Sequence, residues 1–252
     1  MQDRPLRRRA LLAGVATASA LGFFEQARAR TYPGGSMPPW LPFAADPPNA
    51  PQAASPVGWV FFTPEEGAAV EALVDRLIPP DPETPGGKDC GCAVFIDRQL
   101  AGDFGQARGL YMRPPFQAGT PQQGLQSPTT PAALYRQSLA ALDRHCRTGF
   151  AGKGFVHLTA GQQDEILHAL EKNALPLDGA SGRPFFELLV QNAHEGFFAD
   201  PVYGGNRDMA AWRMIGFPGA RYDYRDWVLR HNERYPLPPV GLAGRPDWRR
   251  SP

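Results

Sequence analysis

Hydrophobic residues recur every three or four positions in several stretches of the chain, which is the spacing of amphipathic helices. The clearest stretch opens at Thr63-Pro64, where Thr63 can cap a helix and Glu66 can complete a capping box. Pro79-Pro80 is expected to end this helix, because proline lacks the N–H that a helix interior requires. The residues expected to form its buried face are Val70, Leu73, Val74, Leu77 and Ile78.

Five further helices are expected downstream. Two of them are predicted over Cys92 to Leu100 and near Met209 to Ile215. One begins at Thr130-Pro131, with Tyr135, Leu139, Leu142 and Cys146 inward, and one begins after Thr159, with Ile166, Leu167 and Leu170 inward. Another runs from about Pro184 to Phe198, with Phe186, Leu189, Val190, Ala193 and Phe197 inward. Alternating strand patterns are nearly missing from the sequence. The pattern therefore predicts an all-α fold, a small irregular helical bundle with long Pro/Gly-rich arms and loops.

Two long segments show no periodicity. The chain holds 28 prolines and 27 glycines in 252 residues, and eight of the prolines lie in residues 31–58. This stretch is expected to be an extended arm along a surface, with a disordered leader as the alternative. Residues 101–129 form a second irregular segment, of a length that is usually functional. Four large side chains in these segments are expected to be covered by a partner: Trp40, Phe43, Tyr111 and Phe116.

The first 29 residues are typical of an export signal. Three arginines precede an apolar run from Ala10 to Phe24, and small residues follow up to a cleavage site expected after Ala29. Arg8-Arg9-Ala10-Leu11-Leu12 resembles a twin-arginine signal, an ordinary basic n-region being the alternative. We therefore expect a periplasmic protein that interacts with the twin-arginine export machinery. The expected domains are the signal (1–29), the arm (30–58), a helical domain (59–231) and a Pro-rich tail (232–252).

Charge excludes one class of partner. The chain has 26 basic and 25 acidic residues and a net charge of +1, so nucleic-acid binding is not expected. No later stretch approaches 18 consecutive apolar residues, so membrane attachment is expected only through a partner.

Three cysteines would enter an oxidising compartment, where a disulfide is expected. Cys90 and Cys92 are separated by one residue, which makes a bond between them very tight. A Cys92–Cys146 disulfide with one free thiol is therefore preferred. Zinc is not expected, because no second ligand pair is present.

No motif for catalysis or cofactor binding stands out. The sequence lacks a dinucleotide-binding glycine loop, a Walker loop, a nucleophile elbow and a Cys-x-x-Cys-His haem box. We therefore expect no catalytic residue, metal or cofactor in this chain. His194, Glu195 and Asp200 form the best acid/base cluster and define an alternative, a self-sufficient periplasmic enzyme. A sugar-acid-binding protein is a third interpretation.

Aromatic residues lie close to glycine and proline residues between Glu195 and Ala220. This composition is typical of an interface hot spot or of a tightly packed loop, and both interpretations stay open. The residues expected to contact a partner are Tyr203, Gly204, Gly205, Asn206, Trp212, Phe217 and Pro218.

Three motifs resemble the gluconate 2-dehydrogenase subunit 3 family, the small (gamma) subunit of exported flavin-dependent dehydrogenases. They are Phe62 to Glu66, Phe95 to Gly102, and Phe198 to Asn206 together with Trp212 to Pro218. The resemblance covers roughly residues 58 to 228.

The resemblance implies a complex of three subunits. An FAD-containing large subunit would oxidise the substrate, a multihaem cytochrome c would pass electrons to membrane quinone, and this chain would support export, folding or stability of the large subunit. It would be a non-catalytic subunit of a gluconate 2-dehydrogenase associated with the inner membrane. The small subunit of a related fructose, sorbitol or 2-ketogluconate dehydrogenase is an alternative.

Overall fold

The computed structural model describes residues 58–117, 119–123, 127–175, 177, 182–220 and 224–242. All of them belong to one compact unit, Pro42–Pro252. The expected signal (1–29), nearly all of the arm (30–58) with Trp40 and Phe43, and the last ten residues of the tail lie outside the described residues.

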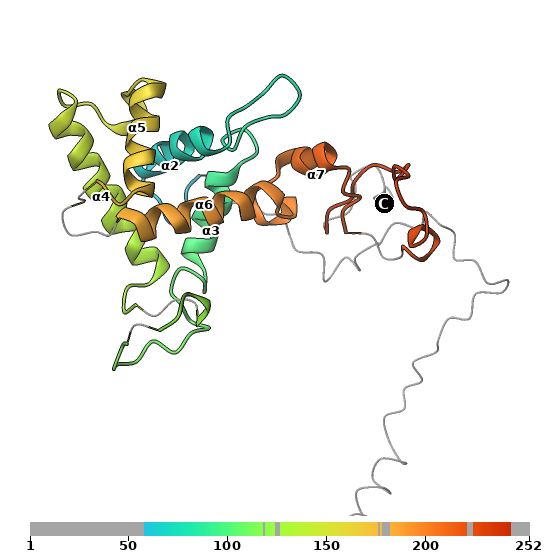
Figure 1. Ribbon diagram of the computed structural model, residues 1–252, viewed down its shortest axis with the longest axis horizontal. Helices are drawn as coiled ribbons and strands as arrows, with labels where there is room; N and C mark the ends of the chain where they lie inside the picture. Colours follow the sequence, from blue (N-terminus) through green and yellow to red (C-terminus); the bar gives the residue numbers. More distant parts are fainter. Residues whose placement is uncertain are drawn as a thin grey trace, which may run out of the picture. The chain divides into compact units, whose positions relative to one another are not determined.

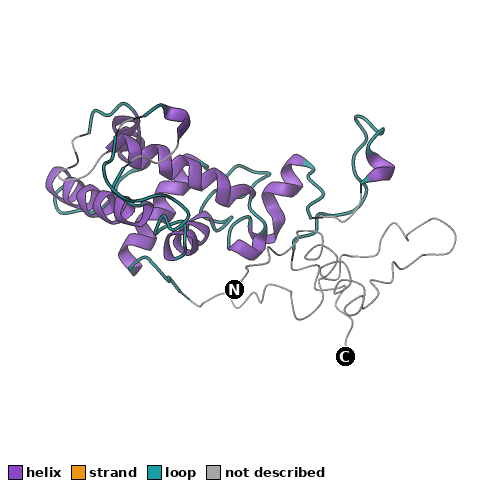
Figure 2. Ribbon diagram, turned by 90° about the horizontal axis from the view of Figure 1, so that it is seen from below, coloured by secondary structure: helices purple, strands orange, loops and turns teal. Residues whose placement is uncertain are grey.

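Six α-helices make up the described part, and no strand occurs in it (Figures 1 and 2). The all-α prediction is thus confirmed. The α-helices are α2 (Pro64–Leu77), α3 (Cys92–Ala101), α4 (Pro131–Gly149), α5 (Ala160–Glu171), α6 (Gly182–Phe198) and α7 (Ala210–Ile215). Short 3-10 helices lie between and after them: η1 (Pro121–Gln123), η2 (Phe155–His157), η3 (Pro201–Tyr203), η4 (Arg207–Met209) and η5 (Arg225–Trp227).

The predicted capping residues begin three of these helices. The Thr63 hydroxyl accepts the Glu66 N–H, and the Glu66 carboxylate accepts the Thr63 N–H at 2.9 Å, which completes the box at α2. Thr159 forms the same box at α5 with Gln162. Thr130 caps α4 ahead of a proline in the first turn.

The core is formed by the crossing of α3 and α6, with α2, α4 and α5 packed around them (Figure 1). Gly196 allows this close approach, because a Cβ at that position would lie 3.0 Å from the Phe95 ring. The largest fully buried apolar side chains are Tyr135, Phe185, Leu73, Ile96, Leu100, Leu142, Leu170, Leu189, Val70 and Val74.

The inward face of α6 agrees with the prediction at Leu189, Ala193 and Phe197 and differs from it at Phe186 and Val190, which are half-buried. Phe185 is fully buried, whereas the predicted Phe186 is only half-buried. The Phe185 ring packs edge-on against Tyr135 at 5.3 Å, and the Tyr135 hydroxyl donates to Asn192 Oδ1 at 3.1 Å. Asn192 and Gly196 complete this buried face, and a pattern of large apolar residues does not point to either position.

All three cysteines are buried free thiols, so the expected Cys92–Cys146 disulfide is not present in the structure. Cys92 lies in the first turn of α3 and Cys146 in the last turns of α4, and each side chain is part of the apolar core. Burial raises the pKa of the Cys92 thiol to about 12 and that of Cys146 to about 11. At neutral pH these groups therefore stay protonated and unreactive.

Candidate functional site

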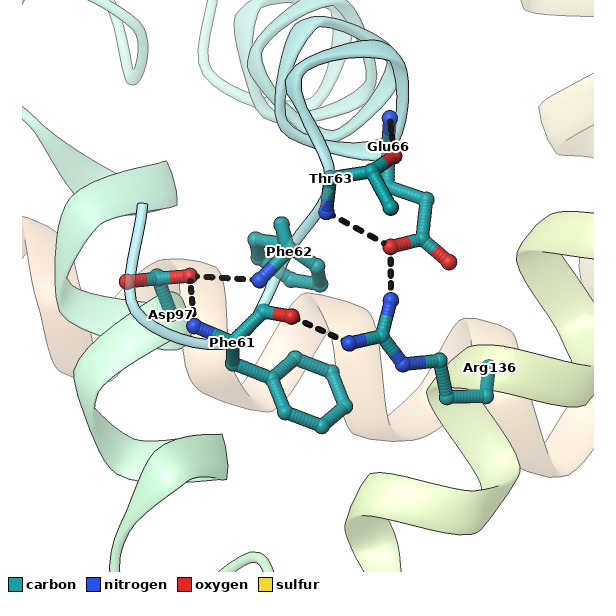
Figure 3. A network of polar contacts seen from close by, with 6 residues as sticks. All are labelled: Phe61, Phe62, Thr63, Glu66, Asp97 and Arg136. Carbon is teal, nitrogen blue, oxygen red and sulfur yellow. Dashed lines mark hydrogen bonds and ion pairs between the residues drawn. The ribbon is translucent and has the colours of Figure 1, made fainter. Parts of the chain in front are cut away.

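A buried carboxylate holds the chain where it enters the helical domain (Figure 3). Asp97, on α3, is 1% exposed and accepts the backbone N–H groups of Val60, Phe61 and Phe62 at 2.7, 2.9 and 2.8 Å. A buried charge is tolerated when hydrogen bonds replace its lost hydration, and three charge-assisted bonds do so here. Asp97 therefore fixes the backbone just before α2.

Arg136 completes this network from α4. Its guanidinium donates to the Glu66 carboxylate and to the Phe61 carbonyl oxygen, and it lies 4.1 Å above the centre of the Phe61 ring. The network thus connects α2, α3 and α4 around residues 60–66 (Figure 3). Because Asp97, Glu66 and Arg136 all bind groups inside the domain, we assign this network a structural role.

The segment after α6 contains seven of the residues expected to contact a partner, and three of these seven are buried. Asn206 is fully buried, donates to the Ala199 carbonyl oxygen at 2.9 Å and accepts the Ala211 N–H at 3.0 Å. Trp212 is 5% exposed, and its Nε1 donates to the Phe198 carbonyl oxygen at 2.8 Å. These two side chains join the end of α6 to α7. Their burial leaves little of either side chain for a partner to contact, and the packed-loop interpretation describes them.

Two glycines of this segment are required by close backbone approach. A Cβ on Gly205 would lie 2.0 Å from the Gly196 carbonyl oxygen, so no other residue fits there. Gly204 has a φ of +100°, which favours glycine, and a Cβ would meet the Arg98 guanidinium at 2.5 Å. Gly205 is buried and Gly204 half-buried, so their role is to pack the segment against α6 and α3.

Other residues of this segment present apolar side chains to solvent. Ile215 is 56% and Phe217 44% exposed, and Tyr203 and Met214 are exposed to similar extents. The Phe217 ring packs edge-on against Trp212 at 5.1 Å, so the buried tryptophan supports an exposed ring. We call Tyr203, Met214, Ile215 and Phe217 the α7 surface. Pro218, also expected at the interface, is half-buried.

A groove of about 700 Å³ lies between the α2–α3 loop and α7. A backbone hydrogen bond joins the two walls, in which the Arg207 N–H donates to the Cys90 carbonyl oxygen at 3.0 Å. We call this cavity the α7 groove. Its loop wall is formed by Glu83, Thr84, Pro85 and Asp89, and its α7 wall by Arg207, Asp208, Ala210, Arg213 and Met214.

The backbone of the α7 wall is strained. Asn206, Asp208 and Met209 have φ values of 44°, 57° and 56°, in the left-handed region that non-glycine residues rarely occupy. Such conformations cost about 1–3 kcal/mol each and cluster at ligand-binding and switch regions. The two hydrogen bonds of Asn206 and its burial keep this segment in place.

The expected acid/base cluster does not line the groove. Glu195 accepts hydrogen bonds from Gln191 and Asn192, and Asp200 accepts the N–H groups of Val202 and Leu242 at 3.0 and 2.7 Å. His194 is exposed on α6. Both carboxylates therefore hold neighbouring backbone or side chains. Within the described ranges, no cluster of three His, Cys, Asp or Glu side chains could hold a metal ion.

The irregular segment after α3 also carries exposed apolar side chains. Tyr111 is 82% exposed, and Leu110 and Phe116 are exposed as well. They lie at the surface, as a contact with a partner would require, but the structure does not bring them into the α7 groove. Of the helices that the structure describes, none is long and apolar enough to cross a bilayer.

Comparison with known proteins connects these features to a family. A model of the gluconate 2-dehydrogenase subunit 3 family matches residues 64–219, from the first residue of α2 to the glycine that follows the α7 surface. We found no significant match among curated proteins or among solved structures. The matched range covers more than half of the chain and includes both the α7 groove and the α7 surface. The chain therefore belongs to the gluconate 2-dehydrogenase subunit 3 family.

Proposed function

We propose that this chain is a non-catalytic small subunit of a periplasmic, membrane-associated, flavin-dependent gluconate 2-dehydrogenase. In this proposal it docks on the FAD-bearing large subunit and supports the export, folding or stability of that subunit. FAD and haem c belong to the partner subunits, and attachment to the inner membrane occurs through them. Family membership supports the gluconate dehydrogenase assignment.

The observation that carries the docking role is the α7 surface. Burying one large apolar side chain stabilises a protein by about 1.5–3 kcal/mol, so exposing Met214, Ile215 and Phe217 together is unfavourable in isolation. The fold nevertheless holds them outward on a rigid base, formed by the buried Asn206 and Trp212. A partner that covers the α7 surface would recover this free energy.

The role in export is supported by the expected twin-arginine signal, because that route is associated with cargo folded before translocation. A large subunit without its own signal could then cross the membrane bound to this chain. The same docking would stabilise the folded large subunit by mass action.

The test is to express the large and cytochrome subunits with and without this chain. We expect that, without it, the FAD-bearing subunit stays in the cytoplasm or loses bound FAD and gluconate-oxidising activity. The measurements are the periplasmic amount of the large subunit and its flavin absorbance. Normal export of an active flavoprotein in the absence of this chain would contradict the proposal.

A further inference from the structure

The two walls of the α7 groove differ in charge, because the loop wall is acidic and the α7 wall carries two arginines and one aspartate. Arg207 and Arg213 lie on the α7 wall, and Glu83 and Asp89 on the loop wall. Among the described residues, no ion pair within 4.0 Å joins the two walls. Arg213 instead donates to the carbonyl oxygen of Asp208, whose side chain lines the same wall. The groove thus holds charges of both signs that do not neutralise one another directly.

Hydrogen bonds keep the two walls in shape. On the loop wall, Asp81 Oδ1 accepts the N–H groups of Glu83 and Thr84 at 2.8 and 2.7 Å and the Thr84 hydroxyl at 2.9 Å. On the α7 wall, Asn206 directly precedes Arg207 and is held by its hydrogen bonds to the Ala199 carbonyl oxygen and the Ala211 N–H. The backbones that carry the charges are therefore positioned before any partner binds.

The α7 groove continues into the α7 surface, because Met214 belongs to both. A partner that covers the exposed apolar side chains therefore also reaches the groove. Ala210, Pro85 and Met214 give the groove an apolar part, and its volume admits several side chains. Arginine is enriched at protein interfaces, since its guanidinium binds carboxylates in a bidentate geometry.

Resting on the proposed function, we propose that the α7 groove binds an extended segment of the FAD-bearing subunit in which an acidic and a basic residue are adjacent. Successive side chains of an extended chain point in opposite directions. In the groove, the acidic side chain would therefore face Arg207 and Arg213, and its basic neighbour would face Glu83 and Asp89.

The first test reverses the charge of the α7 wall in the intact complex. R207E/R213E in the tagged full-length chain is expected to weaken retention of the FAD-bearing subunit at least about tenfold, because like charges then face each other. R147E/R183E is the matched control, with the same change in net charge at two exposed arginines on α4 and α6. Retention by the neutral variant R207Q/R213Q should lie between that of the unmodified chain and that of R207E/R213E. Thermal melting checks that each variant is folded.

The second test identifies the segment. A photo-crosslinking residue at position 210, inside the groove, is expected to capture one peptide of the FAD-bearing subunit. Mass spectrometry should find an acidic and a basic residue next to each other in that peptide. A captured peptide without such a pair would overturn the proposal.

The outcomes separate this inference from the proposed function. If the unmodified chain does not retain the FAD-bearing subunit, the proposed function fails. If it does, and folded R207E/R213E retains the subunit equally well, only the groove inference fails. A last measurement is calorimetry with gluconate. If gluconate binds to the unmodified chain but not to R207E/R213E, the groove is a site for a small sugar acid and the inference is overturned.

Discussion

At both ends of the helical domain a carboxylate accepts backbone N–H groups, but the aromatic and apolar side chains around it are buried at one end and exposed at the other. At the entrance, Asp97 accepts three backbone N–H groups and the aromatic rings turn inward, with Phe62 packed against Tyr135 at 6.2 Å. At the exit, Asp200 accepts two backbone N–H groups and Asn206 joins α6 to α7, but Ile215 and Phe217 point to solvent.

This difference shows that buried polar groups can either close a core or support an exposed surface. The Asp97 network connects three helices around a fully buried carboxylate. The Asn206 junction has an equally buried centre, yet its outer layer is apolar and bordered by a charged groove. A surface that must keep its shape before binding needs such a base, because a flexible surface would lose more entropy on docking.

The largest effect is expected from Asp97→Ala at the entrance. Three N–H groups, one buried and two partly buried, would lose their acceptor, and an unsatisfied buried group costs about 1–3 kcal/mol, so the free energy of unfolding should fall by about 3 kcal/mol. Urea denaturation followed by circular dichroism measures this change. Asp103→Ala, an exposed carboxylate just beyond α3, is the control and should have little effect. Equal loss in both variants would contradict the role of Asp97.

Asn206→Ala should have a smaller but clear effect at the exit. It removes two buried hydrogen bonds at a position with a φ of 44°, which together should cost about 2–3 kcal/mol. If the junction is the base of the α7 surface, retention of the FAD-bearing subunit should also decrease. Asn206→Asp keeps the acceptor for the Ala211 N–H and should retain part of the stability. A variant as stable as the unmodified chain would mean that the junction is not rigid.

Ile215→Asp should separate stability from docking. Exposed substitutions usually change stability by less than about 0.5 kcal/mol, so the midpoint of denaturation should barely move. Retention of the FAD-bearing subunit should nevertheless fall, because a charge would be buried against an apolar partner. Val228→Asp, at another exposed apolar position beyond the family-matched residues, is the control. Unchanged retention with Ile215→Asp would remove α7 from the interface.

The smallest effect concerns a half-buried carboxylate, Asp164, in contrast to the fully buried Asp97. Arg76 donates to both Asp164 oxygens, at 2.8 and 2.7 Å, and these hydrogen bonds lower the pKa of Asp164 below its usual 3.8. The pair therefore stabilises the fold fully above that value, and the stabilisation is lost as the pH falls through the lower pKa of the folded state. Asp164→Asn should flatten the acid limb of a stability–pH curve measured by thermal melting. An unchanged acid limb would show that solvent screens the pair completely.

Helix starts could be predicted because they depend on neighbouring residues. Thr63 with Glu66 and Thr159 with Gln162 form the expected boxes, and Tyr135, Leu139, Leu142 and Cys146 on α4 are buried as the spacing predicted. Each of these features needs only a few residues that are close in the chain. The resemblance to the family is also confirmed, because the family match over residues 64–219 includes the second and third motifs and part of the first.

The division of the exit segment into buried and exposed halves could not be predicted. Trp212 and Phe217 are both large and aromatic, but only contacts with residues 196–199 decide that one is covered and the other exposed. The role of Asp97 in holding the backbone before α2 was not predicted, for a related reason. An aspartate on the buried face of α3, between Ala93 and Leu100, was the available signal, yet its partners lie more than 30 residues earlier.

The groove is the clearest product of tertiary structure. Arg207 and Arg213 are about 120 residues away from Glu83 and Asp89 in the sequence, and the Arg207–Cys90 backbone hydrogen bond and the close approach of Gly91 to Gly204 bring these walls together.

The amino-acid sequence by itself determined the helical class, the helix starts and the family, because these depend on local spacing, caps and short motifs. The tertiary structure decided which side chains close the core and which remain outside, and it assembled the charged groove. Burial and long-range hydrogen bonding are properties of residues distant in the chain, so no local pattern contains them.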